Sequence, residues 1–181
     1  MNIKQHALAG VVEMIPRVFT DARGAFFESF NAQRFAELTG IEENWVQDNH
    51  SISTKGVLRG LHFQLPPHAQ AKLVRVAFGR SLDVVVDIRR DSPTYGQHVK
   101  VMLDAENYNM LYVPRGFAHG FLALEDNNVF LYKCTDYYHP ESEGGLCWND
   151  PALNIDWGVE NPNVSPKDAV LPRLADFNSP F

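Results

Sequence analysis

Cysteines and long apolar runs are scarce in this sequence. Its two cysteines, Cys134 and Cys147, form neither a metal-type pair nor a dense disulfide framework. No apolar run approaches the roughly 18 uncharged residues that cross a bilayer, and residues 1–10 carry no apolar core of a secretory signal. We therefore expect a cytoplasmic protein with reduced thiols and no membrane partner.

Basic clusters and repeats are missing as well. The 181 residues hold 16 Lys and Arg against 22 Asp and Glu, a formal net charge of −6, with no block rich in Lys or Arg. Such a chain lacks the basic surface that holds nucleic acid irrespective of sequence, so we expect no nucleic-acid partner. A small anionic ligand stays compatible with this charge, because a few arginines can gather locally. The length predicts a single domain, residues 1–181.

Short strands separated by Gly, Pro, Asn and Asp make up most of the chain. The predicted strands are 11–15, 26–30, 57–63, 72–78, 82–88, 98–103, 109–113, 120–123 and 129–134. In 82–88 one face is apolar and the other carries Asp83 and Asp87, the period-2 pattern of a sheet with one buried side. Many short antiparallel strands predict an all-β sandwich or barrel. We favour a jelly roll, which strand patterning alone does not separate from other β sandwiches.

Two segments have helical signals. Residues 31–40 begin with Asn31 as N-cap and end at Gly40, and a short turn of helix is expected at Ser165 and Pro166. The C-terminal third is rich in Pro, Asn and Asp, so we expect it to wrap the surface of the sheets.

The densest polar cluster covers residues 47–51 and 56–64. Strand alternation places His62 and Gln64 on one face and Arg59 on the other, but a bulge at Gly60 would bring Arg59 to the same cavity. Taken alone, a single strand histidine is more often a hydrogen-bonded core residue than a catalytic one.

A second cluster covers residues 112–121. Pro and Gly set a turn between two apolar strands there, which would leave Arg115 and His119 near its mouth. Taken alone, a turn with a surface arginine explains this cluster equally well.

Together the two clusters match the halves of a cupin signature: Gly56 with His62, and Pro114-x-Gly116-x-x-His119. Metal-binding cupins need a His-x-His pair and a downstream Glu in the first half. Here Gln64 replaces the second histidine, and no acidic residue lies between residues 65 and 82. With two of four ligands present we expect no metal, which frees the imidazoles for proton transfer.

The likeness extends beyond a generic cupin. The matching stretches, in order, are 19–24 with Glu28, 47–49 with Ser51 and Ser53, 58–64, 72–74, 87–89 with 92–94, 113–121, Tyr132 and Lys133, Tyr138, Glu143, 148–151, and Lys167 and Asp168. In these stretches the sequence strongly resembles the dTDP-4-dehydrorhamnose 3,5-epimerase family, which acts in the pathway to dTDP-L-rhamnose. The match runs through nearly the whole chain, at the spacing of the family.

This resemblance implies a metal-free, cofactor-free jelly roll (a double-stranded β-helix with a few short helices). It also implies a homodimer whose N-terminal segments are exchanged or packed across the interface. The substrate would be a dTDP-4-keto-6-deoxyhexose, epimerised at C3 and C5. The implied catalytic residues are His62 as base, Asp168 as its carboxylate partner, Tyr132 as acid and Lys72 beside the enolate. The implied substrate-binding residues are Arg23, Glu28, Gln47, Asp48, Asn49, Arg59, Lys72, His119, Tyr138, Glu143 and Lys167.

Each catalytic assignment has an ordinary alternative. Without the resemblance, Tyr132 is a core aromatic, Lys72 a solvated strand end and Asp168 a helix-turn residue. The chemistry is nevertheless reasonable, because inversion beside a ketone needs a base on one face and an acid on the other. Arginine forks such as Arg23 and Arg59 suit a diphosphate. Thymine would stack on an aromatic ring, for which the candidates are Phe19, Phe26, Phe27 and Tyr138.

Four rival functions share these residues or this fold. An epimerase that inverts only C3 would share the base and the nucleotide site, and Tyr138 is a candidate for controlling ring orientation. A 3,4-ketoisomerase would share the superfold. A metal-dependent cupin oxygenase is disfavoured by the missing ligands, and a sugar-nucleotide binding protein would bind without turnover.

Overall fold

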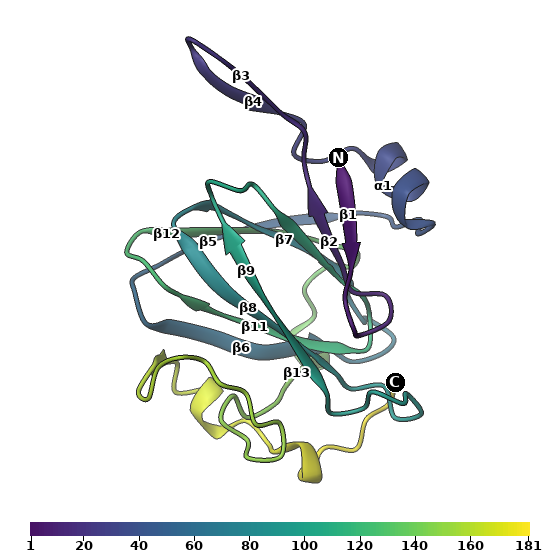
Figure 1. The fold of residues 1–181 in the computed structure, drawn as a ribbon. Helices are drawn as coiled ribbons and strands as arrows, with labels where there is room; N and C mark the ends of the chain where they lie inside the picture. The colour runs from purple at the N-terminus through teal and green to yellow at the C-terminus, as the bar shows by residue number, and fades with distance from the viewer.

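Two antiparallel sheets face each other in the computed structural model, which describes residues 1–181 (Figure 1). The first sheet contains, in spatial order, β1 (Asn2–Gln5), β2 (Val12–Ile15), β10 (Met110–Val113), β7 (Lys72–Phe78), β12 (Asn128–Cys134) and β5 (Gln47–Ser53). The second contains β13 (Glu143–Gly145), β6 (Val57–Gln64), β11 (Phe117–Ala123), β8 (Arg80–Asp87) and β9 (His98–Asp104), with β14 (Asn163–Val164) parallel to β6. The prediction of an all-β jelly roll with a few short helices is confirmed.

Local sequence signals explain the helical elements. In the single α-helix, α1 (Ala32–Thr39), the Asn31 side chain accepts the Arg34 N–H, and Gly40 ends the helix with φ 71°. Both capping predictions are confirmed. Three 3₁₀ turns follow later, η1 (Pro140–Ser142), η2 (Asp168–Val170) and η3 (Leu174–Asp176). None of these helices has the length and apolar character that a membrane crossing requires.

The main core lies between the two sheets. Val74, Val76 and Phe130 from the first sheet meet Val85 and Phe121 from the second, and all five are buried. The rings of Phe121 and Phe130 stack with centroids 3.9 Å apart. These apolar contacts fill one end of the space between the sheets, so the polar side chains of the same faces are left to line the rest.

Strand β8 corrects one prediction, because both of its faces are buried. Val84 and Val86 pack outward under the C-terminal segment, while Asp83 and Asp87 are fully buried as well. The aspartates are tolerated inside because each is hydrogen-bonded, Asp83 to His119 and Asp87 to Arg89. The predicted alternation of β8 is present, but the face that carries Asp83 and Asp87 is buried inside the protein.

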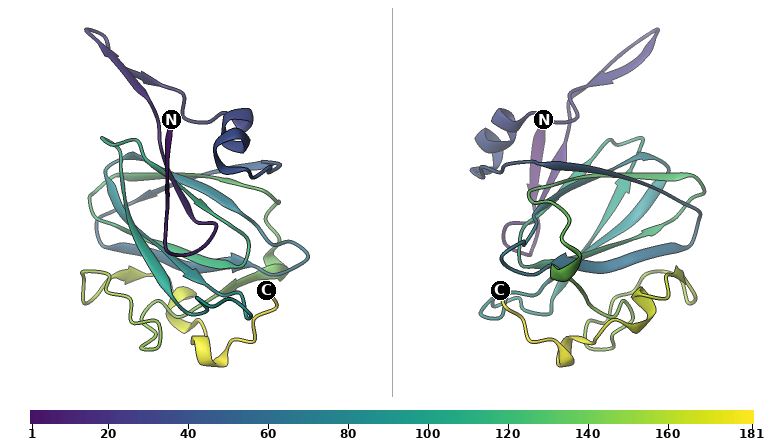
Figure 2. Two further views of the ribbon diagram at one scale, coloured as in Figure 1. Left: turned by 45° about the vertical axis from the view of Figure 1, so that its right-hand side comes forward. Right: turned by 180° about the vertical axis from the view of Figure 1, so that it is seen from behind.

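The C-terminal third covers the outer face of the second sheet, as predicted (Figure 2). Leu146, Leu153 and Trp157 are buried there, and Phe63 contacts Phe177 with ring centroids 5.1 Å apart. This covering segment also brings η2 against β6, which matters for the site described below.

A bulge between β6 and β11 occurs where Gly60 predicted it. His119 lies opposite His62, but two residues later Phe121 lies opposite Arg59, so the register shifts at Gly60. A Cβ on Gly60 would lie 2.4 Å from the Cα of Gly120, and its φ is +135°. Only glycine fits this close approach. The shift turns Arg59 toward the cavity that His62 also lines.

A two-stranded hairpin projects away from the sheets (Figure 1). It consists of β3 (Val18–Asp21) and β4 (Gly24–Phe27), which pair with each other and with no other strand. Phe19 and Phe26 are 52% and 72% exposed on it. Solvent-exposed aromatic rings on a projecting arm are typical of a surface that binds a partner.

Candidate active site

A cavity of about 550 Å³ opens between the sheets, and a smaller one of about 250 Å³ adjoins it. His62, Lys72 and Tyr132 line both, so the two form one continuous site. The larger part is also lined by Ser51, Arg59, His119, Phe121, Phe130, Lys167 and Asp168, among others. The smaller part adds Gln47, Asn49, Gln64, Cys134, Tyr138 and Glu143.

His62 and Asp168 form a hydrogen-bonded pair on one side of the cavity. The His62 Nε2 lies 2.7 Å from Asp168 Oδ1, and the Gly60 N–H donates to Oδ2 at 3.3 Å. The Ser165 hydroxyl accepts the Asp168 N–H at 3.0 Å, which starts the turn of helix that the sequence predicted. Burial raises the pKa of Asp168, but the hydrogen bond and charge of His62 outweigh it, so the pKa lies below its usual value. The carboxylate is therefore ionised at neutral pH.

A second histidine–carboxylate pair lies beside the first. His119 Nε2 is 2.8 Å from Asp83 Oδ2, and His119 lies directly across from His62 in the strand register. The prediction that His119 sits near a turn mouth is wrong, because β11 begins at Phe117 and carries the ring into the interior. The His119 side chain is 8% exposed, against 30% for His62. His62 is thus the more accessible of the two to a ligand in the cavity.

Lys72 and Tyr132 approach the cavity from the opposite sheet. Lys72 lies on β7 opposite Cys134 of β12, two residues from Tyr132. Burial lowers the pKa of Lys72, although the nearby negative charges of Asp83 and Glu143 act to raise it. Lys72 is therefore not the solvated strand end that its position also allowed. Its side chain lines both parts of the cavity between the two sheets.

Tyr132 combines packing with access. Its ring lies 6.4 Å from that of Phe130, centroid to centroid, and it also lines the cavity. Burial raises the pKa of Tyr132, with a smaller contribution from Glu143, so its hydroxyl keeps its proton at neutral pH. The ring is thus both part of the core and a proton donor available to the cavity.

Most of the predicted binding residues gather around these four. Gln47 donates to Asn49 Oδ1 at 3.0 Å, and both line the smaller part of the cavity. Glu143 forms an ion pair with Lys167 and accepts the Tyr138 hydroxyl at 2.8 Å. Burial raises the pKa of Glu143, but these two partners lower it below its usual value. This linked group closes the cavity between β5, β13 and the C-terminal segment.

Comparison with known proteins decides the family. A family profile described as dTDP-4-dehydrorhamnose 3,5-epimerase matches residues 5–176. The chain belongs to the dTDP-4-dehydrorhamnose 3,5-epimerase family. It is 53% identical to the enzyme of that name from Salmonella typhimurium, over 96% of each chain. It is also similar to the crystal structure of a Legionella pneumophila epimerase in complex with dTDP-4-keto-L-rhamnose, with a TM-score of 0.94, 49% identity and coverage of 98% and 94%.

One structural relative carries a different specificity in its name. A 3′-monoepimerase from Streptomyces bikiniensis, solved with dTDP-quinovose, has a TM-score of 0.89 and 35% identity, covering 94% of this chain and 88% of its own. Proteins named as 3,5-epimerases and a protein named as a 3′-monoepimerase therefore share this fold.

Three predicted binding residues do not join this chain's own epimerase cavity. Alternation along β5 places Asp48 on the outer face, where it pairs with Lys133 at 2.9 Å, so its role in substrate binding stays a prediction. Arg23 lies on the projecting hairpin with its side chain 89% exposed and paired to Asp21. Glu28 follows the hairpin and lies 3.5 Å from Arg34 of α1.

Ser51 is a cavity residue of this epimerase that received no role from the sequence. It follows Gln47 and Asn49 at two-residue spacing on β5, so it shares their face. Its hydroxyl is buried without a hydrogen-bond partner and lines the larger part of the cavity. The alternation was the signal that could have found it. A buried hydroxyl without a partner is suited to bind a polar group of the substrate.

Proposed function

We propose that this chain converts dTDP-4-dehydro-6-deoxy-D-glucose into dTDP-4-dehydro-L-rhamnose by inverting C3 and C5. One observation carries the proposal beyond the family name. His62 comes from the second sheet, with Asp168 of η2 behind it, whereas Tyr132 and Lys72 come from the first sheet, across a single cavity. A base and an acid on opposite walls suit removal of a proton from one face of a sugar and its return to the other.

The proton transfers follow from the hydrogen bonds. The His62 Nε2–H donates to Asp168, which leaves Nδ1 as the acceptor. Nδ1 takes the proton from C3 or C5, and the electron pair of that C–H bond moves onto the C4 oxygen as an enolate. The enolate collapses as Tyr132 donates its proton to the same carbon from the other side. Exchange with water then restores neutral His62 and Tyr132, and the sequence repeats at the second carbon.

Two charged groups stabilise the intermediates. Asp168 is ionised and buried, so it stabilises the imidazolium that forms on His62. Lys72 supplies a positive charge for the enolate oxygen, in a partly desolvated place where such an interaction is stronger than in water. No cofactor is needed for this chemistry, because the ketone itself acidifies both C–H bonds.

The diphosphate needs cations in a protein of net charge −6. Arg59 and Lys167 line the same cavity and supply them. The Arg59 Nε donates to Ser53 at 3.2 Å, which holds the guanidinium at the rim. A guanidinium fork binds two phosphate oxygens at once. We expect the enzyme to work in the cytoplasm, in keeping with its two free cysteines.

The projecting hairpin supports a homodimer. Arg23 lies on it with two exposed aromatic rings, Phe19 and Phe26, and is not among the residues that line its own cavity. In a symmetric dimer the hairpin of each subunit would reach the cavity of the other. Mixing inactive Arg23→Ala and His62→Ala proteins under exchange should restore about a quarter of the activity, since half the dimers are mixed and each keeps one intact site. No recovery would place Arg23 outside the partner's site.

Deuterium incorporation tests the reaction directly. Purified protein is incubated in heavy water with dTDP-4-keto-6-deoxyglucose, and His62→Ala serves as the control. Label at both C3 and C5, lost in the variant, supports the double epimerase with His62 as base. Label at C3 alone would assign the chain to the single-epimerase group. No label, with tight nucleotide binding, would contradict the proposed reaction.

A further inference from the structure

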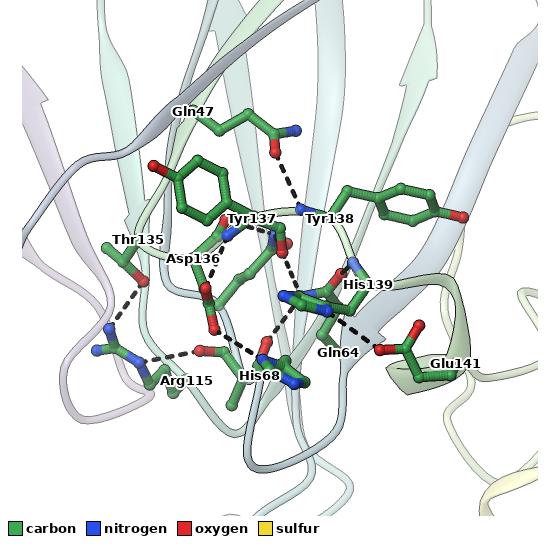
Figure 3. A network of polar contacts seen from close by, with 12 residues as sticks. Gln47, Gln64, His68, Arg115, Thr135, Asp136, Tyr137, Tyr138, His139 and Glu141 are labelled. Atoms are coloured by element: carbon green, nitrogen blue, oxygen red, sulfur yellow. Dashed lines mark hydrogen bonds and ion pairs between the residues drawn. The ribbon is translucent and has the colours of Figure 1, made fainter.

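A group of metal-ligating side chains lies outside the wall of the substrate cavity (Figure 3). His68 comes from the loop between β6 and β7, while Asp136 and His139 come from the segment that follows β12. One ligand atom of each residue lies within 4.8 Å of the other two. All three side chains are about one-third exposed, at 32%, 30% and 31%, so a hydrated ion can reach them.

The spacing within the group suits a tetrahedral ion. His68 Nδ1 lies 3.3 Å from Asp136 Oδ2. With metal–ligand bonds of about 2.0–2.1 Å, two ligands of a tetrahedral site lie about 3.3 Å apart. The remaining ligand atoms need to close by only about 1.5 Å from their largest separation, which side-chain rotation supplies. His139 also contacts Glu141 Oε1 through Nδ1 at 3.1 Å, the kind of carboxylate contact that orients a ligating imidazole.

A rigid frame holds the two segments together. The Gln64 amide, buried on β6, donates to the carbonyls of His68 and Tyr137 and accepts the N–H of His139. Gln70 donates to the carbonyls of Asp136 and Tyr137. Both histidines are therefore fixed through the same buried side chain, and little backbone rearrangement is needed to bind an ion.

Charge favours a cation at this place. The rings of His68 and His139 stack with centroids 3.5 Å apart and 11° between their planes, so one ring must turn about its side-chain bonds before the lone pairs of both can meet at one ion. The carboxylates of Asp136 and Glu141 each contact one of the two imidazoles, Asp136 that of His68 and Glu141 that of His139. The nearest guanidinium, Arg115, is paired with Glu43.

We propose that His68, Asp136 and His139 bind one divalent transition-metal ion, with Zn²⁺ the best match to two imidazoles and a carboxylate. Water would complete the tetrahedron. Such an ion would join the β6–β7 loop to the segment that carries Tyr138, whose side chain lines the smaller part of the substrate cavity. The site would therefore restrain Tyr138 without taking part in proton transfer. This consequence for Tyr138 rests on the proposed epimerase function, whereas binding of the ion does not.

Calorimetric titration of Zn²⁺ into chelator-treated protein tests the proposal. One equivalent should bind to the wild type, and His139→Ala should weaken the affinity at least about tenfold. Asp136→Asn should do the same while keeping the oxygen that accepts the Tyr137 N–H. The matched control is His50→Ala, which removes an exposed histidine of β5 that lies opposite Leu131, within β12 rather than in the segment after it, and should bind as the wild type does.

Thermal unfolding supplies a second readout that is independent of turnover. At about a hundredfold excess over the wild-type Kd, Zn²⁺ should raise the Tm of the wild type by roughly 5 to 10 °C and that of His139→Ala by no more than about half as much. The variants should melt near the wild type without metal. Equal Zn²⁺ affinity in the wild type and in both ligand variants, or no saturable binding, would overturn the proposal. Loss of deuterium exchange in the wild type would instead contradict the epimerase assignment and leave the metal result standing.

Discussion

Replacing Asp168 by Asn isolates the electrostatic part of catalysis. The amide keeps the shape and its oxygen can still accept the His62 Nε2–H, so the tautomer is kept, but it carries no charge for the imidazolium and gives up the bond from the Gly60 N–H. When His62 becomes an imidazolium, its interaction with a carboxylate about 4 Å away, centre to centre, is worth about 4 kcal/mol at an effective dielectric constant of 20. The His62 side chain is 30% exposed, so we reduce this to about 3 kcal/mol. At 1.36 kcal/mol per tenfold, kcat should fall roughly 10²-fold, with KM changed by less than about threefold.

The second histidine–carboxylate pair provides the matched comparison. Asp83→Asn makes the same chemical change beside His119, whose side chain is 8% exposed. If His62 is the base, Asp168→Asn must reduce the rate of deuterium exchange more than Asp83→Asn does. Both variants would be assayed at saturating substrate, with circular dichroism to confirm folding. A larger loss in Asp83→Asn, or a kcat within threefold of wild type in Asp168→Asn, would refute the assignment.

Three further changes have defined outcomes. Burial raises the pKa of Asp87, but hydrogen bonds from Arg89 and two hydroxyls bring it to about 2. Asp87→Asn should therefore cost about 2 kcal/mol of unfolding free energy at pH 7. A pKa that is lowered in the folded state adds its full stability only above the unfolded pKa. The difference in unfolding free energy between the wild type and Asp87→Asn should therefore narrow as the pH falls from about 4 to 2. A difference that stays constant over this range in urea unfolding would contradict the prediction. Gly60→Ala should cost about 3 kcal/mol or more, seen as a lower Tm, since its Cβ would meet Gly120 at 2.4 Å. Tyr132→Phe should keep the exchange of substrate protons with solvent through His62 but slow product formation by about 10²-fold. Equal losses of exchange and product formation would contradict the acid role of Tyr132.

The sequence predicted those elements whose signals are local. The helix α1 carries both of its caps, and β7 is a short, mostly apolar run that ends before Gly79, so both were placed within a residue. Strand β5 was not predicted, because it is polar on both faces. Gln47 and Asn49 face the cavity while Asp48 faces Lys133 on the outer side, which leaves no apolar alternation to detect. The same strand shows why Asp48 lies apart from Gln47 and Asn49, since adjacent residues of a motif point to opposite faces of a strand.

The catalytic pair shows where physical patterning reaches its limit. His62 and Asp168 are 106 positions apart, and they meet only because the C-terminal segment folds back over the second sheet. Patterning predicted that this segment wraps the surface and that a turn begins at Ser165, but neither fact selects Asp168 as a partner. The family resemblance supplied that pairing. The group at His68 and His139 escaped prediction for a similar reason, since its ligands come from two loops that only the folded sheet brings together.

The place of Gln64 explains why His62 is available as a base. A metal-binding cupin would have a second histidine here, and an ion would then occupy the imidazole nitrogen that proton abstraction requires. In this chain the Gln64 amide uses both its nitrogen and its oxygen on the backbone of the segments that carry His68 and His139. Asp168 takes the role of electrostatic partner from the other side, through Nε2, and leaves Nδ1 free. With Asp168 as its partner, His62 therefore serves as a proton acceptor at a position where a metal-binding cupin has a ligand. Gln64, which stands in place of the second ligand, holds the loops outside the cavity.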